Sequence, residues 1–456
     1  MLVDLNSLAR TVIKSCIFLI FVTILFPEYF VVSQRHFFRF QKWEEINSSN
    51  ILIPKVGPIL NSDLDKNNIT SIYYSKIDTN KLLLKNIFSE LSLDDGKGFR
   101  FRIYGMAGLS LGKNLFIQNE FEFDSHGKND PHFNGVERGF KNGWVGYLQH
   151  SSLNYYYNNG HLSIGRGNPY YFNMNESLLI NSNITSPEYL WWKHRNKLLQ
   201  FDWAIFMLSP INDNNRIINF HRYAIENKKF RIGFSEGILI AYQDWSVKEL
   251  AYVLPASIHL ETEENRGINA NLIWLIDGMV KFKEWTYYGE LLIDDFALDG
   301  KSPPQMAFSF GIGKKLKKSL LNIEYIKINR WTGNHCDPIK VWLESDLPIG
   351  HSLGSDASHI LFSSHTKINK NLIMELDLKS FIHNDLNAVE RLLEWPNDLE
   401  CDHNFNDIEL SESIQFYNLS YGINLHYSHK YNSVVNVKLD YIKKDLFWSV
   451  GFVYSY

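Results

Sequence analysis

WSVGFVYSY, residues 448–456, is the stretch of sequence that decides the fold. Successive side chains of an extended strand point to opposite faces, so one face of this stretch collects only large apolar side chains. That face carries Trp448, Val450, Phe452, Tyr454 and Tyr456. The same alternation occurs in a half-buried strand of a soluble sheet and in a barrel strand with lipid outside. The stretch therefore predicts a strand with one apolar face, and the rest of the chain decides between water and lipid.

Alternation with a period of two extends backwards from this stretch through most of the chain. Charged or polar side chains alternate with hydrocarbon in residues 99–111, 115–123, 372–379 and 435–441. No long helical stripe competes with this pattern. Dividing residues 99–456 by roughly 20 residues per strand and connection predicts about 18 antiparallel strands.

The first residues have the pattern of an export signal. Arg10 and Lys14 precede an apolar run over residues 16–26, as in secretory signal peptides. The alternative is a membrane-anchoring helix, but a run of about 11 residues is short for a span that needs roughly 20. We expect residues 1–33 to be a cleaved signal peptide.

The remaining chain divides into a short preface and a long barrel. Residues 34–98 lack the regular alternation, and NKLLLKNIFSEL over residues 80–91 predicts a short amphipathic helix. We expect a periplasmic or plug-like N-terminal segment over residues 34–98 and an outer-membrane barrel over residues 99–456. Long polar stretches within the barrel are expected to be outward loops that act as plug or ligand segments. They cover residues 125–142, 168–197, 331–358 and 384–407.

Composition agrees with an exported barrel. Aromatic residues make up 15% of the chain while its mean hydropathy is only −0.23, a mixture unusual for helical membrane proteins. A net charge of −4 offers no basic surface to a nucleic acid. Cys336 and Cys401 lie in polar, turn-like contexts, and whether they form a disulfide stays open.

The terminal stretch resembles the C-terminal insertion signal of bacterial outer-membrane barrels, in which alternating apolar residues end on an aromatic. Together with the export pattern and the long run of strands, it favours lipid over a soluble sandwich. The expected fold is all-β: a transmembrane antiparallel β-barrel in the bacterial outer membrane. We expect a monomer surrounded by outer-membrane lipid.

Three internal blocks resemble the Wzi-type capsule-assembly family of outer-membrane proteins. They are NFHRYAIENKKFRIGFSEGILI (residues 219–240), YYGELLIDDF (residues 287–296) and IGRGNPYYFNMNESLLINSNITSPEY (residues 164–189). The third departs from the family pattern, in which a tryptophan and a glycine are expected near Pro169, Tyr170 and Tyr171. The resemblance implies a large barrel occluded by loops, with helical elements on the periplasmic side. It also implies lectin-like retention of capsular polysaccharide without catalysis.

Several charged residues are candidates for a network inside the barrel. Glu290 and Asp294 share the polar face of their strand, whereas Glu236 falls on an otherwise apolar face, which indicates a bulge or a place near the rim. The hypothesis joins Arg222, Glu236, Glu290 and Asp294, with Asp295 at the edge. The alternative is a set of unrelated, solvated lumen charges. A calcium site of Asp294, Asp295 and Asp299 is a further alternative, although its spacing matches no calcium loop.

Two aromatic and basic clusters are candidates for sugar recognition, because rings cover sugar CH patches and guanidinium groups bond hydroxyls or carboxylates. The clusters are Trp191, Trp192, His194 and Arg195, and Arg330 with Trp331. The alternative places these tryptophans in the aromatic girdle at the membrane interface.

Three functions remain open at this stage. The first is a non-enzymatic barrel that binds capsular or exopolysaccharide. The second is a diffusion porin. The third is an outer-membrane lipase or glycan-modifying enzyme built on His351 and Ser352, although adjacent residues of a strand point to opposite faces. No zinc-binding spacing or phosphate loop is present, and His221 alone predicts a structural role, so no metal or cofactor is expected.

Overall fold

The computed structural model describes most of the chain after residue 81. It covers residues 82–94, 98–111, 114–127, 144–157, 159–167, 176–181, 184–196, 198–227, 229–243, 253–255, 259, 270–295, 305–369, 372–383, 386–393, 416–429, 433–442 and 445–454. The expected signal peptide over residues 1–33 lies outside these ranges. Side chains of β1 and of most of the last three strands are also outside the description.

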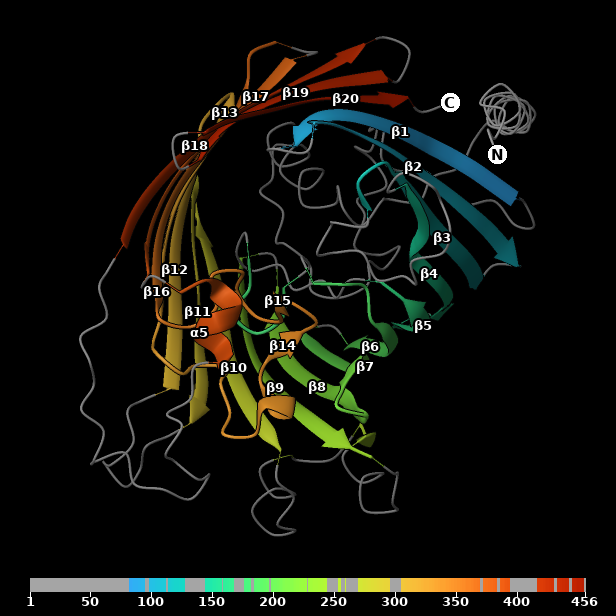
Figure 1. Ribbon diagram of the computed structural model, residues 1–456, viewed down its shortest axis with the longest axis vertical. Coiled ribbons are helices and arrows are strands. Elements are labelled where there is room, and N and C mark those ends of the chain that lie inside the picture. Colours follow the sequence, from blue (N-terminus) through green and yellow to red (C-terminus); the bar gives the residue numbers. More distant parts are fainter. Residues whose placement is uncertain are drawn as a thin grey trace, which may run out of the picture.

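Eighteen antiparallel strands form one closed ring, which confirms the predicted fold class. Each strand pairs with its neighbours along the chain, and β1 also pairs with β20, so the sheet has no free edge. Figure 1 shows this closure where the blue and red strands meet. The strands are β1 (Leu82–Asp94), β2 (Gly98–Leu111), β3 (Leu115–Asp124), β4 (Val145–Tyr157), β5 (Gly160–Arg166), β6 (Glu188–Asn196), β7 (Leu199–Ile211), β8 (Asn214–Glu226), β9 (Phe230–Tyr242), β10 (Asn271–Phe282), β11 (Trp285–Asp295), β12 (Gln305–Lys315), β13 (Ser319–Ile328), β16 (Ala357–Lys367), β17 (Leu372–His383), β18 (Phe416–His429), β19 (Ser433–Ile442) and β20 (Asp445–Tyr454).

The two ends of the barrel differ in the length of their connections. Because strand direction alternates, the long segments before β4, β6, β10, β16 and β18 all lie at one end, which we call the loop end. The other end carries short turns, such as residues 197–198 and 283–284. Outer-membrane barrels place short turns in the periplasm and long loops outside. The loop end is therefore the outward end.

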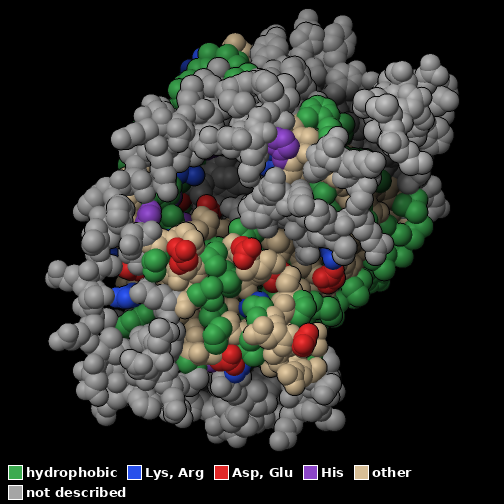
Figure 2. All heavy atoms as spheres, in the orientation of Figure 1, with side chains coloured by type: hydrophobic (Ala, Val, Ile, Leu, Met, Phe, Trp, Pro, Cys, Tyr) green, Lys and Arg blue, Asp and Glu red, His purple; other side chains and the backbone are tan. Residues whose placement is uncertain are grey.

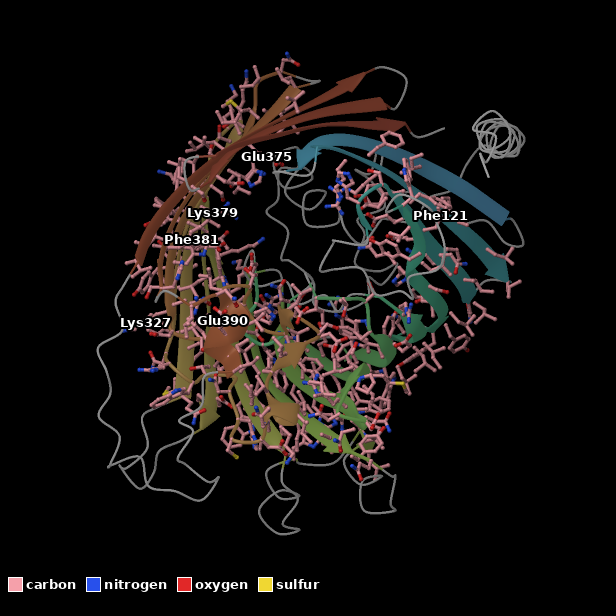
Figure 3. The ribbon with its side chains drawn as sticks, viewed as in Figure 1. Phe121, Lys327, Glu375, Lys379, Phe381 and Glu390 are labelled. Atoms are coloured by element: carbon pink, nitrogen blue, oxygen red, sulfur yellow. The ribbon has the colours of Figure 1, made fainter. Side chains whose placement is uncertain are left out.

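The two faces of the wall carry different chemistry. On β17, Leu378 points outward and is 41% exposed, whereas Glu375 points into the barrel and is buried. Figure 3 shows Glu375, Lys379 and Phe381 on this strand. Exposed hydrocarbon on the outside and polar groups inside are what a lipid-embedded barrel requires. No described helix is long and apolar enough to cross a membrane.

The inside of the barrel near the loop end contains a packed core that lies against β6 to β13. Two loops turn inward there, and an apolar core forms between them and the wall, with Leu179, Trp342 and Ile349 at most 2% exposed. The short strands β14 (Leu343–Glu344) and β15 (Leu347–Pro348), the 3-10 helix η6 (Pro338–Lys340) and the helix α5 (Ala388–Leu393) belong to this filling. Figure 1 shows α5, β14 and β15 within the ring of strands.

Two sequence expectations are corrected by the structure. The helix predicted over residues 80–91 is wrong, because residues 82–91 lie in strand β1, so the first described strand of the barrel begins at Leu82 within the predicted N-terminal segment. The loop predicted over residues 168–197 ends in strand β6. The described helices η6 and α5 lie at the loop end. The periplasmic helical elements that the family resemblance implied fall outside the described residues.

Candidate functional site

The filling of the barrel, here called the plug, is the candidate site. It consists of residues 176–181 and 184–187, residues 329–356, and helix α5. Backbone and ring groups join its two loops: the Trp342 indole donates to the Leu179 carbonyl at 2.8 Å, and the Asn181 amide donates to Ile349 at 2.6 Å. The tertiary hydrogen bonds satisfy backbone groups that a buried loop would otherwise leave unpaired. The plug is therefore an ordered part of the barrel.

Gly350 permits the closest contact between the two loops. A Cβ atom at this position would lie 2.3 Å from the carbonyl oxygen of Leu178. No side-chain rotation relieves a contact with backbone, so any other residue would push the loops apart. The glycine is thus required by packing.

Two acids of β11 hold one loop each. Glu290 accepts hydrogen bonds from the Leu178 amide at 2.8 Å and from the Ser177 hydroxyl at 3.2 Å. Asp294 accepts from the Gly333 amide at 2.6 Å. Both carboxylates face inward, as the alternation of the strand predicts. They anchor the plug to the wall, a role that the sequence did not reveal.

Two further anchors come from residues that sequence reasoning missed. The buried guanidinium of Arg216 on β8 donates to the carbonyls of Ile339, Val341 and Leu343 at 2.7 to 2.9 Å. Glu344 accepts from the Ser209 amide at 2.9 Å and from the Thr185 hydroxyl at 3.0 Å. Three carbonyl acceptors around one guanidinium fix a loop firmly, because each bond is charge-assisted.

Helix α5 closes the plug from the side of β16 and β17. Arg391 is 3% exposed and donates to the Ser355 carbonyl at 2.7 Å and also to the carbonyls of Leu353 and Leu386. The Asn334 amide donates to the Arg391 carbonyl at 3.1 Å. The segment that carries α5 therefore extends the plug beyond its two main loops.

Farther from the loop end than the plug, charged side chains of β7 to β10 contact one another on the inner wall. Arg222 forms a bidentate ion pair with Asp277 at 2.9 to 3.1 Å, and its other amino group lies 3.9 Å from Asp202. Arg231 lies 3.4 Å from Asp277. All four side chains are fully buried. We call these residues the charge ladder.

The predicted network is present only in part. Arg222 belongs to the charge ladder, but its main partner is Asp277, which the sequence analysis did not select. Glu290 lies opposite Asp277 in the register of β10 and β11. Glu236 is on the outer face of β9, away from the ladder. The backbone of Asp295 pairs with Gln305 after a bulge, while its side chain and all of Asp299 lie outside the description.

The first predicted aromatic cluster is divided between two faces of β6. Trp191 is 3% exposed and belongs to the apolar core inside the barrel. Trp192 and His194 point outward and contact the Tyr157 hydroxyl, which accepts from the Trp192 indole at 2.8 Å. Adjacent residues of a strand cannot share a face, so these residues do not form one sugar-binding cluster.

The remaining predicted aromatic and basic residues lie in two other places. Arg195 donates to Gln200 at 3.1 Å and lies 3.7 Å from Glu226. Arg330 lies over the Trp331 ring at 5.2 Å, at the start of the plug. Trp331 is only 2% exposed, so its ring is not available as a platform for a sugar. Arg330 is partly exposed.

His351 and Ser352 both turn toward Glu176 in the other plug loop. The Ser352 hydroxyl donates to the Glu176 carboxylate, and Nε2 of His351 lies 3.7 Å from the same oxygen. Burial alone would raise the pKa of Glu176, but the neighbouring His351, the Ser352 hydrogen bonds and Lys379 outweigh it and lower the pKa to about 2. This arrangement joins two loops and does not direct the hydroxyl to the imidazole, as a nucleophile–base pair would require.

Cys336, in the same plug loop, is disulfide-bonded. Cys401, the partner that the sequence suggested, lies outside the described residues.

Comparison with known proteins supports the fold. No protein-family model and no curated protein sequence matches the chain. Among solved structures, Wzi of Escherichia coli, described as an outer-membrane carbohydrate-binding β-barrel involved in group 1 capsule assembly, matches with a TM-score of 0.63 at 10% identity. The match covers 94% of this chain and 100% of that chain.

Two other barrels match more distantly. OccK2 (OpdF) of Pseudomonas aeruginosa in complex with glucuronate has a TM-score of 0.47 at 10% identity, covering 83% of this chain and 97% of that chain. An OmpT loop-deletion mutant of Vibrio cholerae has a TM-score of 0.39 at 9% identity, covering 83% and 100%. At such identities the likeness to Wzi concerns the fold alone. The chain is an outer-membrane β-barrel.

Proposed function

We propose that this barrel binds capsular or exopolysaccharide at its loop end and retains it at the cell surface without catalysing a reaction. The observation that carries the proposal is the plug. Its apolar core packs against the inner wall from β6 to β13, with Leu179, Trp342 and Ile349 buried. A diffusion porin needs a continuous polar channel, and this packing opposes one. A plugged barrel instead offers a fixed outward surface.

The anchors of the plug also favour a binding role. Glu290, Asp294, Arg216 and Glu344 fix the loops to strands β7, β8 and β11. A preformed surface binds a ligand with a smaller ordering cost than mobile loops do. Wzi, which has a similar fold, is described as a carbohydrate-binding barrel involved in capsule assembly. That description supports the same substrate class for this chain.

The proposed contact surface includes the tip of the β14–β15 hairpin. Ser345 and Asp346 are exposed there, and the Ser345 hydroxyl lies 3.3 Å from Ser209 at the loop end of β7. Figure 2 shows acidic side chains beside hydrophobic ones on the face of the molecule that it presents. Hydroxyl and carboxylate groups beside hydrocarbon are suited to sugar hydroxyls and CH patches. Arg330 adds a guanidinium for acidic sugars.

The experiment compares cell-attached with released polysaccharide. Deleting the gene is expected to move polysaccharide from the cells to the medium, and the wild-type gene is expected to restore attachment. A variant with Ser345→Ala, Asp346→Ala and Arg330→Ala should restore it poorly, although it still folds and reaches the outer membrane. Glu284→Ala, in a turn at the opposite end, is the matched control and should restore attachment fully.

Unchanged attachment after deletion would contradict the proposed function. Full restoration by the triple variant would instead reject the surface and leave the function standing. Heat-modifiable electrophoretic mobility of each variant confirms that a loss of attachment does not come from a misfolded barrel.

A further inference from the structure

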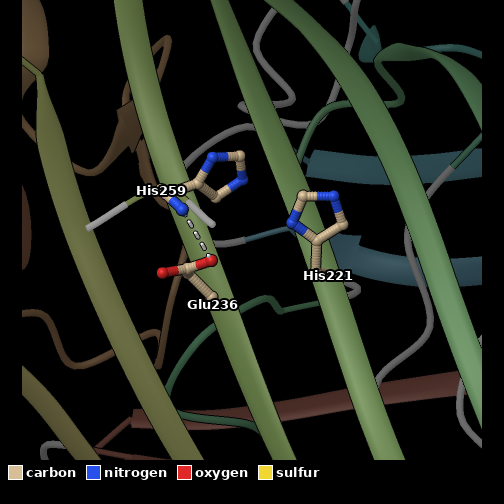
Figure 4. A group of neighbouring side chains, drawn as sticks. All are labelled: His221, Glu236 and His259. Carbon is tan, nitrogen blue, oxygen red and sulfur yellow. Dashed lines mark hydrogen bonds between the residues drawn. The ribbon is translucent and has the colours of Figure 1, made fainter. Parts of the chain in front are cut away.

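Three side chains meet on the outside of the barrel wall, away from the plug and the charge ladder. His221 on β8 lies opposite Glu236 on β9 in the strand register. His259 reaches them from the long connection between β9 and β10. Figure 4 shows the three groups together.

These three polar residues are buried on a face of the wall that also carries exposed apolar residues. Tyr223 and Phe234, on the same outer face, are 49% and 42% exposed, as lipid-facing residues should be. His221, Glu236 and His259 are instead 1%, 6% and 0% exposed. Val253 and His259 of the β9–β10 connection pack on this part of the wall.

The connection is packed on the wall beside the three polar residues. Val253 from this connection contacts an apolar cluster on the outer face that includes Ile217, Ile238 and Ile240. Val253 therefore holds its part of the connection against the wall by hydrocarbon contacts, and the three polar side chains are removed from water. Polar atoms that are removed from water need partners.

The ring nitrogens of His259 have no hydrogen-bond partner among the described residues. Its ring stacks on that of His221 with the centroids 4.6 Å apart. Glu236 is already oriented, because its two carboxylate oxygens accept from the His259 amide and from the Trp274 indole, each at 3.1 Å. The backbone of Leu254 also interacts with the His221 ring. A buried imidazole whose nitrogens lack a partner among the described residues, beside an oriented carboxylate, indicates a missing ligand.

The ligand atoms of the three residues all lie within 4.8 Å of one another. Two imidazoles and one carboxylate are a common donor set for Zn²⁺, and a fourth position is left for water. Calcium and magnesium prefer oxygen donors, which disfavours them here. Contacts from Trp274 and Leu254 would orient the donors as outer-shell groups do in zinc sites.

We propose that His221, Glu236 and His259 bind a divalent transition metal, with Zn²⁺ as the best fit, and that the metal fastens the β9–β10 connection to the outer wall. This site is independent of polysaccharide binding. Its effect is to add a bond at His259 to the apolar contact that Val253 makes with the wall.

The test uses the detergent-purified full-length barrel after treatment with a chelator. Titration with Zn²⁺ alone, followed by calorimetry and by metal analysis after dialysis, is expected to give one tightly bound ion per chain. His221→Ala, Glu236→Gln and His259→Ala should each weaken binding at least about tenfold. His194→Ala, on the outer face of β6, is the matched control and should bind as the wild type does.

Two further readouts keep the test decisive if a variant fails to fold. Zn²⁺ should slow tryptic cleavage of the β9–β10 connection in the wild type and not in His259→Ala. Co²⁺ should give the visible absorption of a tetrahedral site with the wild type. A wild-type barrel that binds no stoichiometric Zn²⁺ and gives no such absorption would overturn the proposal, as would equally tight binding by the His221→Ala and His259→Ala double variant.

Discussion

Buried charges in the lumen depend on a single small residue. Gly233 on β9 lies between Arg222 on β8 and Asp277 on β10, so the two side chains can meet over its Cα atom. A Cβ atom there would lie 2.2 Å from a carboxylate oxygen of Asp277 and 2.4 Å from an amino group of Arg222. The absence of a side chain at this position thus permits an ion pair between strands that are not neighbours.

Gly233→Ala is expected to destabilise the barrel. The added methyl group displaces the Arg222–Asp277 pair, and leaving buried charges imperfectly paired costs up to about 3 kcal/mol. Gly278→Ala on the adjacent strand is the matched control, because its Cβ atom would meet nothing within 4 Å. Urea unfolding in lipid vesicles measures both variants. Equal stability of the two would show that the pair tolerates the methyl group.

Sequence reasoning at this scale found the inward acids but not their partners. Glu290 and Asp294 follow from the alternation of β11, since both share its polar face. Asp277 was missed because its inward neighbours Leu275 and Met279 are apolar and buried, which hides a charged position within an apolar run. Which carboxylate meets which guanidinium depends on the register of several strands.

At the scale of elements, the plug depends on contacts between two loops far apart in sequence. Glu176 in the first loop accepts from the amide of Ser352 in the second at 3.0 Å and also from its hydroxyl. The low pKa of Glu176, about 2, means that the folded protein prefers the charged carboxylate.

This contact predicts a pH dependence of stability. The ordinary pKa of 4.5 applies to the unfolded chain, so between pH 4.5 and 2 the unfolded state binds a proton that the folded state does not. Stabilisation by Glu176 should be complete above pH 4.5 and lost as pH falls toward 2. The measurement is the difference in melting temperature between wild type and Glu176→Gln from pH 2 to 7. A difference that stays constant over this range would contradict the assignment.

Strand β1 shows why one element escaped sequence reasoning. Its register slips between Lys85 and Phe88, where a bulge interrupts the pairing with β2. The bulge also interrupts the period-two alternation, and the apolar residues of LLLKNIFSEL then recur at helical spacing. The division of Trp191 and Trp192 has a different cause: the two residues are adjacent in the sequence, but adjacent residues of a strand point to opposite faces.

At the scale of the whole molecule, alternation and length predicted a closed barrel of about eighteen strands, and the structure has eighteen. Alternation could not predict the plug, because its loops have irregular backbone and their contacts join residues more than a hundred positions apart, such as Leu178 and Glu290. The outer metal cluster was equally hidden, since His221, Glu236 and His259 match no ligand spacing.

The proposed function depends most on closure of the lumen by the plug. The direct measurement is the ion conductance of the purified wild-type barrel in planar lipid bilayers. The plug predicts no steady conductance steps, whereas a variant carrying Glu290→Ala and Asp294→Ala, which releases both loops from β11, should show them. Steady steps from the wild type, of the size given by an open barrel, would contradict the account.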